Sequence, residues 1–174
     1  MPRFGHAVLL PAFTAIALAL AAAGAAAQEL SAGDREFINT AAEGGHAEVA
    51  AGETAATSEN AAVAGFGRQM VEDHTKMNDE LAALAKKKGV TPPSSADVAS
   101  QAKTAVTGAL PGTAFDKQYV SSQLDDHRET LQLLQDQARS GQDPELKAFA
   151  EKYAPVVQQH IAELQDLQKR PELQ

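Results

Sequence analysis

The stretch MVEDHTKMNDELAAL, residues 70–84, carries the clearest fold signal in the sequence. Apolar side chains recur along it at helical spacing, at Met70, Met77, Leu81 and Leu84. Such a stripe is typical of an amphipathic helix with one face in a core. His74 occupies the slot between Met70 and Met77, where another apolar residue is expected. The stretch therefore predicts a packed helix that directs an imidazole toward its own core.

Helical periodicity extends over most of the chain, and strand-like alternation is absent from it. Gly89 ends one periodic segment, and Asp143 followed by Pro144 has the pattern of a helix N-cap and first turn. Thr113 and Asp116 have the spacing of a capping box. The predicted long helices cover residues 34–56, 58–88, 113–140 and 144–169.

The link over residues 89–112 is longer than a helical hairpin needs, and it predicts a short helix near 95–106. The links inside each pair of long helices are short, so each pair should form an antiparallel hairpin. The predicted fold class is all-α. It is an antiparallel four-helix bundle built from two helical hairpins, with a long connection between the second and third long helices.

The first 27 residues have the layout of a secretory signal peptide. Arg3 precedes an uncharged Ala/Leu-rich run, and three alanines at 25–27 resemble a cleavage site. A single anchoring helix is the alternative, but the run is short and contains Pro11, which makes it a poor membrane span. We expect residues 28–174 to form one domain that is exported to the periplasm without a transmembrane anchor. Association with the outer membrane stays open.

Composition narrows the classes of function. The chain has no cysteine, so neither a disulfide nor a thiolate metal ligand is available to it. The formal charge is −8, and without Arg3, the one charged residue before Gln28, it is −9. Such acidity disfavours nucleic acid as a partner. The lysines at 86–88 are expected to close a helix before Gly89, where positive charge meets the negative end of the helix dipole.

Each predicted long helix places one ionisable residue on its apolar stripe. These residues are Glu48, His74, His127 and His160. Asp73 and Asp126 each precede one of the inward histidines; Asp73 could orient a ring or be solvated, and Asp126 lies further toward solvent. Burying three imidazoles and a carboxylate requires partners for many polar atoms. A metal or proton-linked site and a purely structural polar network are the two explanations.

Four segments of the sequence resemble a known family. AAEGGHAEVAAGE, FGRQMVEDHTKMNDELAALAKKKGV, GTAFDKQYV with LDDHRE, and ELKAFAEKYAPVVQQHIAEL are similar to successive blocks of a ferritin-like family of exported bacterial proteins of unknown function, often labelled putative outer membrane proteins. The resemblance covers roughly residues 34–167. It implies a ferritin-like bundle with six shared polar positions, which are candidate metal-site residues: Glu48, Asp73, His74, Asp126, His127 and His160.

Ferritin-like connectivity places the two hairpin turns at opposite ends of the bundle. Counting residues from the turns at about 1.5 Å each pairs His74 with His127 and Glu48 with His160, in layers about 10 Å apart. Pro155 is expected to bend the last helix and to aim His160 at Glu48.

Three functions are compatible with these residues. A periplasmic module could bind copper, zinc or nickel through imidazoles and carboxylates. A non-catalytic envelope protein, stress-linked or acting with another envelope protein, could use the polar layer to fix helix register. An enzyme is disfavoured, because no nucleophile accompanied by a base is found. The lack of Glu-x-x-His motifs with inward side chains argues against a di-iron centre. The sequence leaves the oligomeric state open.

Overall fold

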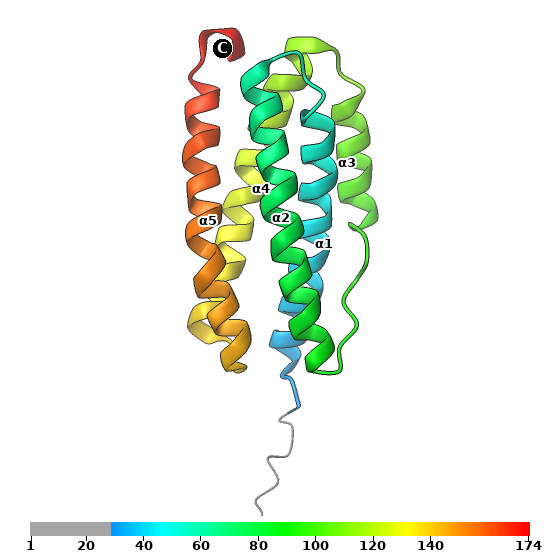
Figure 1. The fold of residues 1–174 in the computed structure, drawn as a ribbon, viewed down its shortest axis with the longest axis vertical. Helices are drawn as coiled ribbons and strands as arrows, with labels where there is room; N and C mark the ends of the chain where they lie inside the picture. The colour runs from blue at the N-terminus through cyan, green and yellow to red at the C-terminus, as the bar shows by residue number, and fades with distance from the viewer. Residues whose placement is uncertain (1–28) are drawn as a thin grey trace, which may run out of the picture.

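A computed structural model describes residues 29–174 of the chain, and within them every regular element is a helix (Figure 1). The elements are α1 (Ala32–Ala55), α2 (Ala61–Lys87), α3 (Val98–Gly108), α4 (Gly112–Ser140), α5 (Pro144–Gln168) and the 3-10 turn η1 (Pro171–Leu173). The all-helical prediction is confirmed, including the short helix in the long link. The signal peptide predicted over 1–27 lies outside the described residues.

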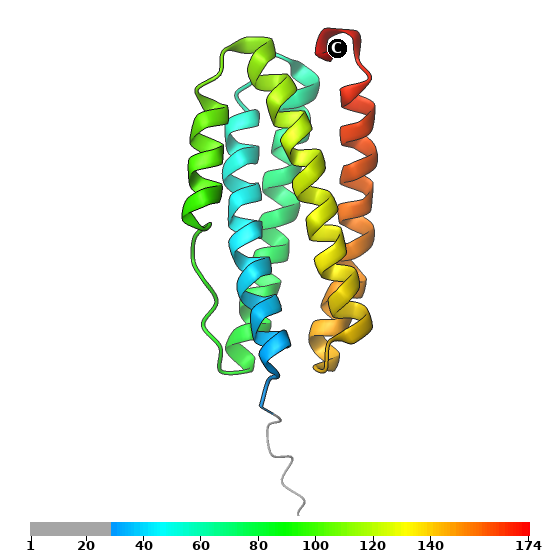
Figure 2. The ribbon, with the colours of Figure 1, turned by 180° about the vertical axis from the view of Figure 1, so that it is seen from behind.

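The four long helices lie side by side, and α3 runs along the outside of the bundle (Figures 1 and 2). The turn between α1 and α2 and the turn between α4 and α5 are at opposite ends, so α1 and α5 run one way while α2 and α4 run the other. The connection from α2 to α4 returns along the length of the bundle and includes α3. None of the described helices is both long and apolar enough to cross a membrane.

Side-chain caps set the start of four helices. Ser31, Asn60, Asp97 and Asp143 each accept a hydrogen bond from a backbone N–H of the first turn of α1, α2, α3 and α5. The predicted capping box at Thr113 is wrong, because α4 already begins at Gly112, after Pro111, with no side-chain cap. Asp116 instead accepts a hydrogen bond from the Ser58 hydroxyl at 2.6 Å, which ties α4 to the α1–α2 turn.

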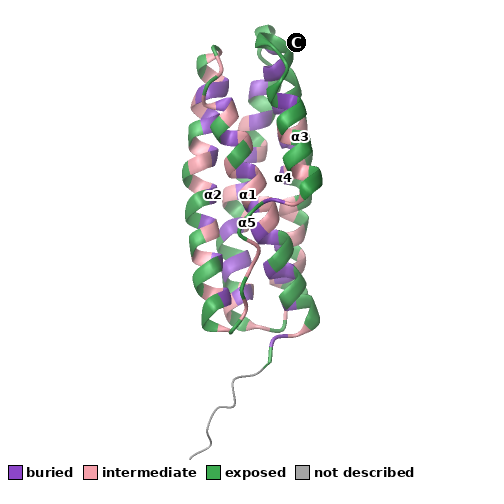
Figure 3. Cartoon of the chain, turned by 90° about the vertical axis from the view of Figure 1, so that its right-hand side faces the viewer, coloured by how far each residue is buried: buried purple, intermediate pink, exposed green. Residues whose placement is uncertain are grey.

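The core consists of two apolar clusters separated by a polar layer. One cluster includes Phe37, Leu81 and Phe149, and the other includes Phe66, Tyr119 and Leu164. Buried residues face the inside of the bundle, whereas α3 is largely exposed (Figure 3). The inward histidines lie between the two clusters. In α2, for example, His74 stands between Met70, which belongs to the cluster with Phe66, and Met77, which belongs to the cluster with Phe37.

Two glycines allow α1 and α2 to approach closely. A Cβ atom on Gly67 would lie 2.6 Å from the backbone nitrogen of Ala56 and 2.8 Å from the carbonyl oxygen of Gly52. A Cβ atom on Gly52 would in turn lie 2.9 Å from the carbonyl oxygen of Gly67. Backbone atoms cannot move aside as a flexible side chain can, so the helix contact itself requires glycine here.

Gly67→Ala is therefore expected to lower the free energy of unfolding by about 1–3 kcal/mol, because overpacking at a backbone contact outweighs the gain in helix propensity. Gly65→Ala, in the same helix, is the matched control, since a Cβ atom on Gly65 would lie no closer than 4.0 Å to the Arg68 side chain. The control should be neutral or stabilised by up to about 1 kcal/mol. Urea denaturation measures both values, and equal stability of the two variants would contradict the close approach.

Candidate metal centre

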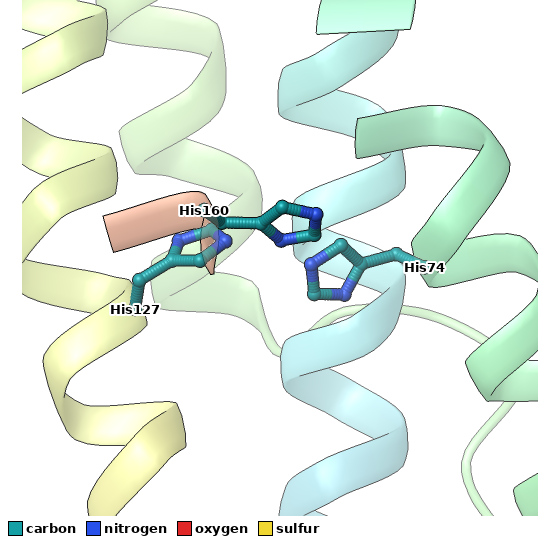
Figure 4. A group of neighbouring side chains, drawn as sticks. All are labelled: His74, His127 and His160. Atoms are coloured by element: carbon teal, nitrogen blue, oxygen red, sulfur yellow. The ribbon is translucent and has the colours of Figure 1, made fainter. Parts of the chain in front are cut away.

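Three histidines from three helices meet in the middle of the bundle. His74 of α2, His127 of α4 and His160 of α5 point toward one another (Figure 4). Their ring centroids are 5.4–5.7 Å apart, and each residue is at most 2% exposed. One nitrogen from each ring lies within 4.8 Å of the other two. The placement of His74 opposite His127 agrees with the prediction from the sequence.

Two of the rings are oriented by a hydrogen bond at one nitrogen. His127 Nδ1 lies 2.9 Å from the carbonyl oxygen of Gln123, one helical turn earlier, and His160 Nε2 lies 3.0 Å from Asp73 Oδ2. Both partners are acceptors, so each ring nitrogen that faces them carries the proton. When such a ring binds a metal ion, it does so through its other nitrogen, which must then carry a lone pair.

The remaining ring nitrogens have no partner. His127 Nε2, His160 Nδ1 and both nitrogens of His74 are buried and make no hydrogen bond with any described group. An unpaired buried polar atom costs about 1–3 kcal/mol, so such atoms are rare in folded proteins. Four of them lie in one layer, so they are candidate ligand atoms.

The electrostatics of the site favour neutral imidazoles. Burial lowers the pKa of His74 well below 6.5, and the neighbouring His127 and His160 lower it further. Burial also lowers the pKa of His127 from 6.5 to about 4, and His160 adds to the effect. A neutral imidazole is the form that binds a metal ion, so at neutral pH these two rings need lose no proton before they coordinate.

Glu48 of α1 lies beside the histidines. Its Oε1 is 3.9 Å from His127 Nδ1, its Oε2 has no partner among the described residues, and the residue is 5% exposed. Burial, reinforced by the charge of Asp126, raises the pKa of Glu48 from 4.5 to about 8. The carboxyl group is therefore mostly protonated at neutral pH.

The predicted arrangement in two layers is wrong. His160 joins His74 and His127 instead of facing Glu48, and its polar partner is Asp73. The prediction counted residues from the hairpin turns and assumed helices of about 28 residues, whereas α5 has 25 residues and α4 has 29. Side chains also tilt toward the N-terminus of their helix, so those of His74 and His160, on antiparallel helices, converge. α5 continues as a helix through Pro155, with His160 turned into the core.

The two aspartates differ in what they contact. Asp73 of α2 lies within hydrogen-bonding distance of the His160 ring on α5, so of its two predicted roles it has that of orienting a ring. Asp126 lies 2.6 Å from Lys103 of α3 in a partly exposed ion pair and does not join the group of ring nitrogens. Gln123 acts on His127 through its backbone carbonyl, and no side-chain pattern in the sequence signals such a contact.

This donor set suits a first-row transition metal. Three neutral imidazoles are appropriate ligands for zinc, copper and nickel, and three protein ligands leave further positions open. Tetrahedral zinc holds its nitrogen ligands about 3.4 Å apart. Nitrogens that already lie within 4.8 Å can reach this spacing through small side-chain rotations.

A family model described as Domain of unknown function (DUF4142) matches residues 19–167, which is more than half of the chain. The chain belongs to this family. The match extends over all five helices from α1 to Leu167 in α5 and includes every candidate residue of the metal centre. Neither the comparison with curated proteins nor the comparison with solved structures found a match for this member of DUF4142.

Proposed function

We propose that this DUF4142 protein binds one divalent transition metal ion, namely copper, zinc or nickel, through His74, His127 and His160. The unpaired ring nitrogens carry the proposal. Two rings are already oriented by Gln123 and Asp73, and one nitrogen from each of the three rings lies within 4.8 Å of the others. Hydrogen bonds of this kind from the outer nitrogen are typical of metal-bound histidine.

A purely structural polar network accounts less well for the same residues. Such a network stabilises a core when its members pair with one another, because half-satisfied buried polar groups destabilise it. Here the three rings contact edge-on or tilted, with centroids 5.4–5.7 Å apart, and no hydrogen bond joins one ring to another. An ion at their centre would satisfy one nitrogen of each ring.

The remaining residues of the predicted site have supporting roles in this proposal. Asp73 fixes the orientation of His160, while Glu48 lies close enough to His127 to respond to the charge of a bound ion. Asp126 has no part in binding, since it pairs with Lys103. Metal binding of this kind does not require the two Glu-x-x-His motifs of di-iron bundles.

The proposal also includes the type of helical bundle and the cellular location of the protein. A ferritin-like arrangement is supported by hairpin turns at opposite ends of the bundle and by the long return connection. Export to the periplasm is supported by the charge and composition of residues 1–27. We infer a metal-binding protein of the cell envelope, which uses its site for binding and not for a reaction on a substrate.

Titration of the metal-free protein tests the proposal. An ion present at about 100 times its Kd stabilises the folded state by about 2.7 kcal/mol, which corresponds to a rise in Tm of roughly 5–10 °C for a domain of this size. Zinc, copper and nickel should each be titrated, with calorimetry and thermal unfolding as the readouts.

The His74→Ala, His127→Ala double variant should bind no ion at this site and show no rise in Tm. His46→Ala is the matched control, because His46 is on α1 and does not join the three rings. It should behave as the parent does. If the double variant and the parent respond alike to every ion, or neither responds, the proposed function is wrong.

A further inference from the structure

A pocket of about 730 Å³ lies between α1, α3 and α4, next to the histidines. α3 forms one wall with Ser100, Lys103 and Thr107, and α1 and α4 form the others. Glu48 and His74 also line it, whereas His127 and His160 do not. Its volume is within the range of pockets that hold small organic ligands.

Three buried polar side chains that line this pocket have atoms without a partner. They are Glu48 Oε2, the Tyr119 hydroxyl and Gln123 Oε1, and their residues are 5%, 2% and 3% exposed. Glu48 approaches from α1, and Tyr119 and Gln123 approach from α4, one turn apart. Polar groups buried to this degree are normally paired, so they indicate a ligand with a hydrogen-bonding group.

The remaining wall is largely apolar and partly aromatic. Phe115 stacks on Tyr119 with ring centroids 5.8 Å apart and an angle of 19° between the planes, and Ala51, Met77 and Leu133 add aliphatic surface. A flat ring would bury its faces against such a wall. The pocket thus combines an apolar body with a small group of hydrogen-bonding atoms.

The charges around the pocket disfavour an anionic ligand. Its acidic lining residues, apart from the buried Glu48, are Glu43, Asp97, Asp126, Glu129 and Asp136. The two basic ones are already paired, Lys103 with Asp126 at 2.6 Å and Arg128 with Asp125 at 3.1 Å. A buried anion would find no free cation on the described lining, and burying a charge without a partner is costly.

We propose that this pocket binds a small molecule that carries no negative charge and has an apolar ring and a single hydroxyl group. The hydroxyl would donate to Gln123 Oε1 and accept from the Tyr119 hydroxyl, while the ring packs on the Phe115 side of the pocket. This second site adjoins the histidine cluster at His74, but it is tested in protein without metal, so its outcome does not depend on metal binding.

The test is an NMR titration of the full, metal-free chain with benzyl alcohol and two analogues of similar size. Toluene lacks the hydroxyl, and benzoate is an anion. Benzyl alcohol should bind about fivefold or more tightly than toluene, because one or two net hydrogen bonds are gained, and amides of α1 and α4 should shift. Benzoate should bind more weakly than benzyl alcohol, because the two basic residues of the described lining are already paired.

Gln123→Leu provides the matched variant, since it removes the acceptor, keeps the volume and retains the backbone carbonyl that orients His127. In it the preference for benzyl alcohol over toluene should fall severalfold, with toluene binding unchanged or tighter. The proposal is overturned if benzoate binds as tightly as benzyl alcohol. It is equally overturned if Gln123→Leu leaves the preference intact, or if no probe shifts the amides that line the pocket.

Discussion

Replacing Glu48 with glutamine is expected to raise the free energy of unfolding by about 4–5 kcal/mol above pH 8. This magnitude follows because folding raises the pKa of the Glu48 carboxyl from 4.5 to about 8. Because the pKa is raised in the folded state, the stability associated with the protonated carboxyl is complete below pH 4.5 and is lost as the pH rises to about 8. Glutamine keeps the shape of the protonated acid without this loss. Metal-free protein should be used throughout.

Urea denaturation between pH 5 and 9 measures this difference. The advantage of Glu48→Gln should be small at pH 5 and grow with pH. Glu53→Gln on the exposed side of α1 is the matched control and should change stability by less than about 0.5 kcal/mol at every pH. A constant difference between parent and Glu48→Gln across this range would show that folding does not raise the pKa of the Glu48 carboxyl.

His74→Leu is expected to have opposite effects on stability and on metal binding. Both ring nitrogens of His74 are buried without a partner, so a leucine of similar volume should stabilise the metal-free protein by about 2 kcal/mol at pH 7. The gain should increase below pH 6.5. The pKa of His74 is lowered in the folded state, so the parent loses stability as the pH falls through the ordinary value of 6.5. Metal affinity should fall by at least a hundredfold.

This pair of effects separates the two explanations of the buried histidines. A ring that belongs to a structural network would destabilise the protein when it is replaced, and metal ions would be irrelevant. If the ring instead serves metal binding, replacing it with leucine stabilises the metal-free protein. Denaturation of parent and His74→Leu with and without zinc decides between them, and His46→Leu shows the effect of a histidine outside the cluster. A loss of stability of 1 kcal/mol or more in metal-free His74→Leu would favour the network.

The helices and their inward polar residues could be predicted from the sequence because both are local properties. Stripe positions follow from spacing of three and four residues, and caps such as Asp143 follow from residue type. The burial of Glu48, His74, His127 and His160 was implied by the same spacing. The spacing of residues decides which face of a helix a side chain lies on, and this does not depend on which helix packs against that face.

Contacts between helices could not be predicted in the same way. The height of His160 relative to His74 depends on unequal helix lengths and on the tilt of side chains, and an error of a few residues moves a ring by a full turn. Asp34 illustrates the same limit. It is buried at the start of α1 and accepts hydrogen bonds from Gln137 and from the backbone of Gln142 and Asp143, more than 100 positions away. Nothing local in the sequence signals that partnership.

The most direct test of the central claim is a crystal structure of the zinc-loaded protein with anomalous diffraction recorded on both sides of the zinc edge. The account predicts one strong anomalous peak inside the bundle, about 2.0–2.1 Å from one nitrogen of each of His74, His127 and His160. His127 Nδ1 and His160 Nε2 should keep their hydrogen bonds to Gln123 and Asp73. An anomalous peak only at surface residues, or none in crystals grown with excess zinc, would contradict it.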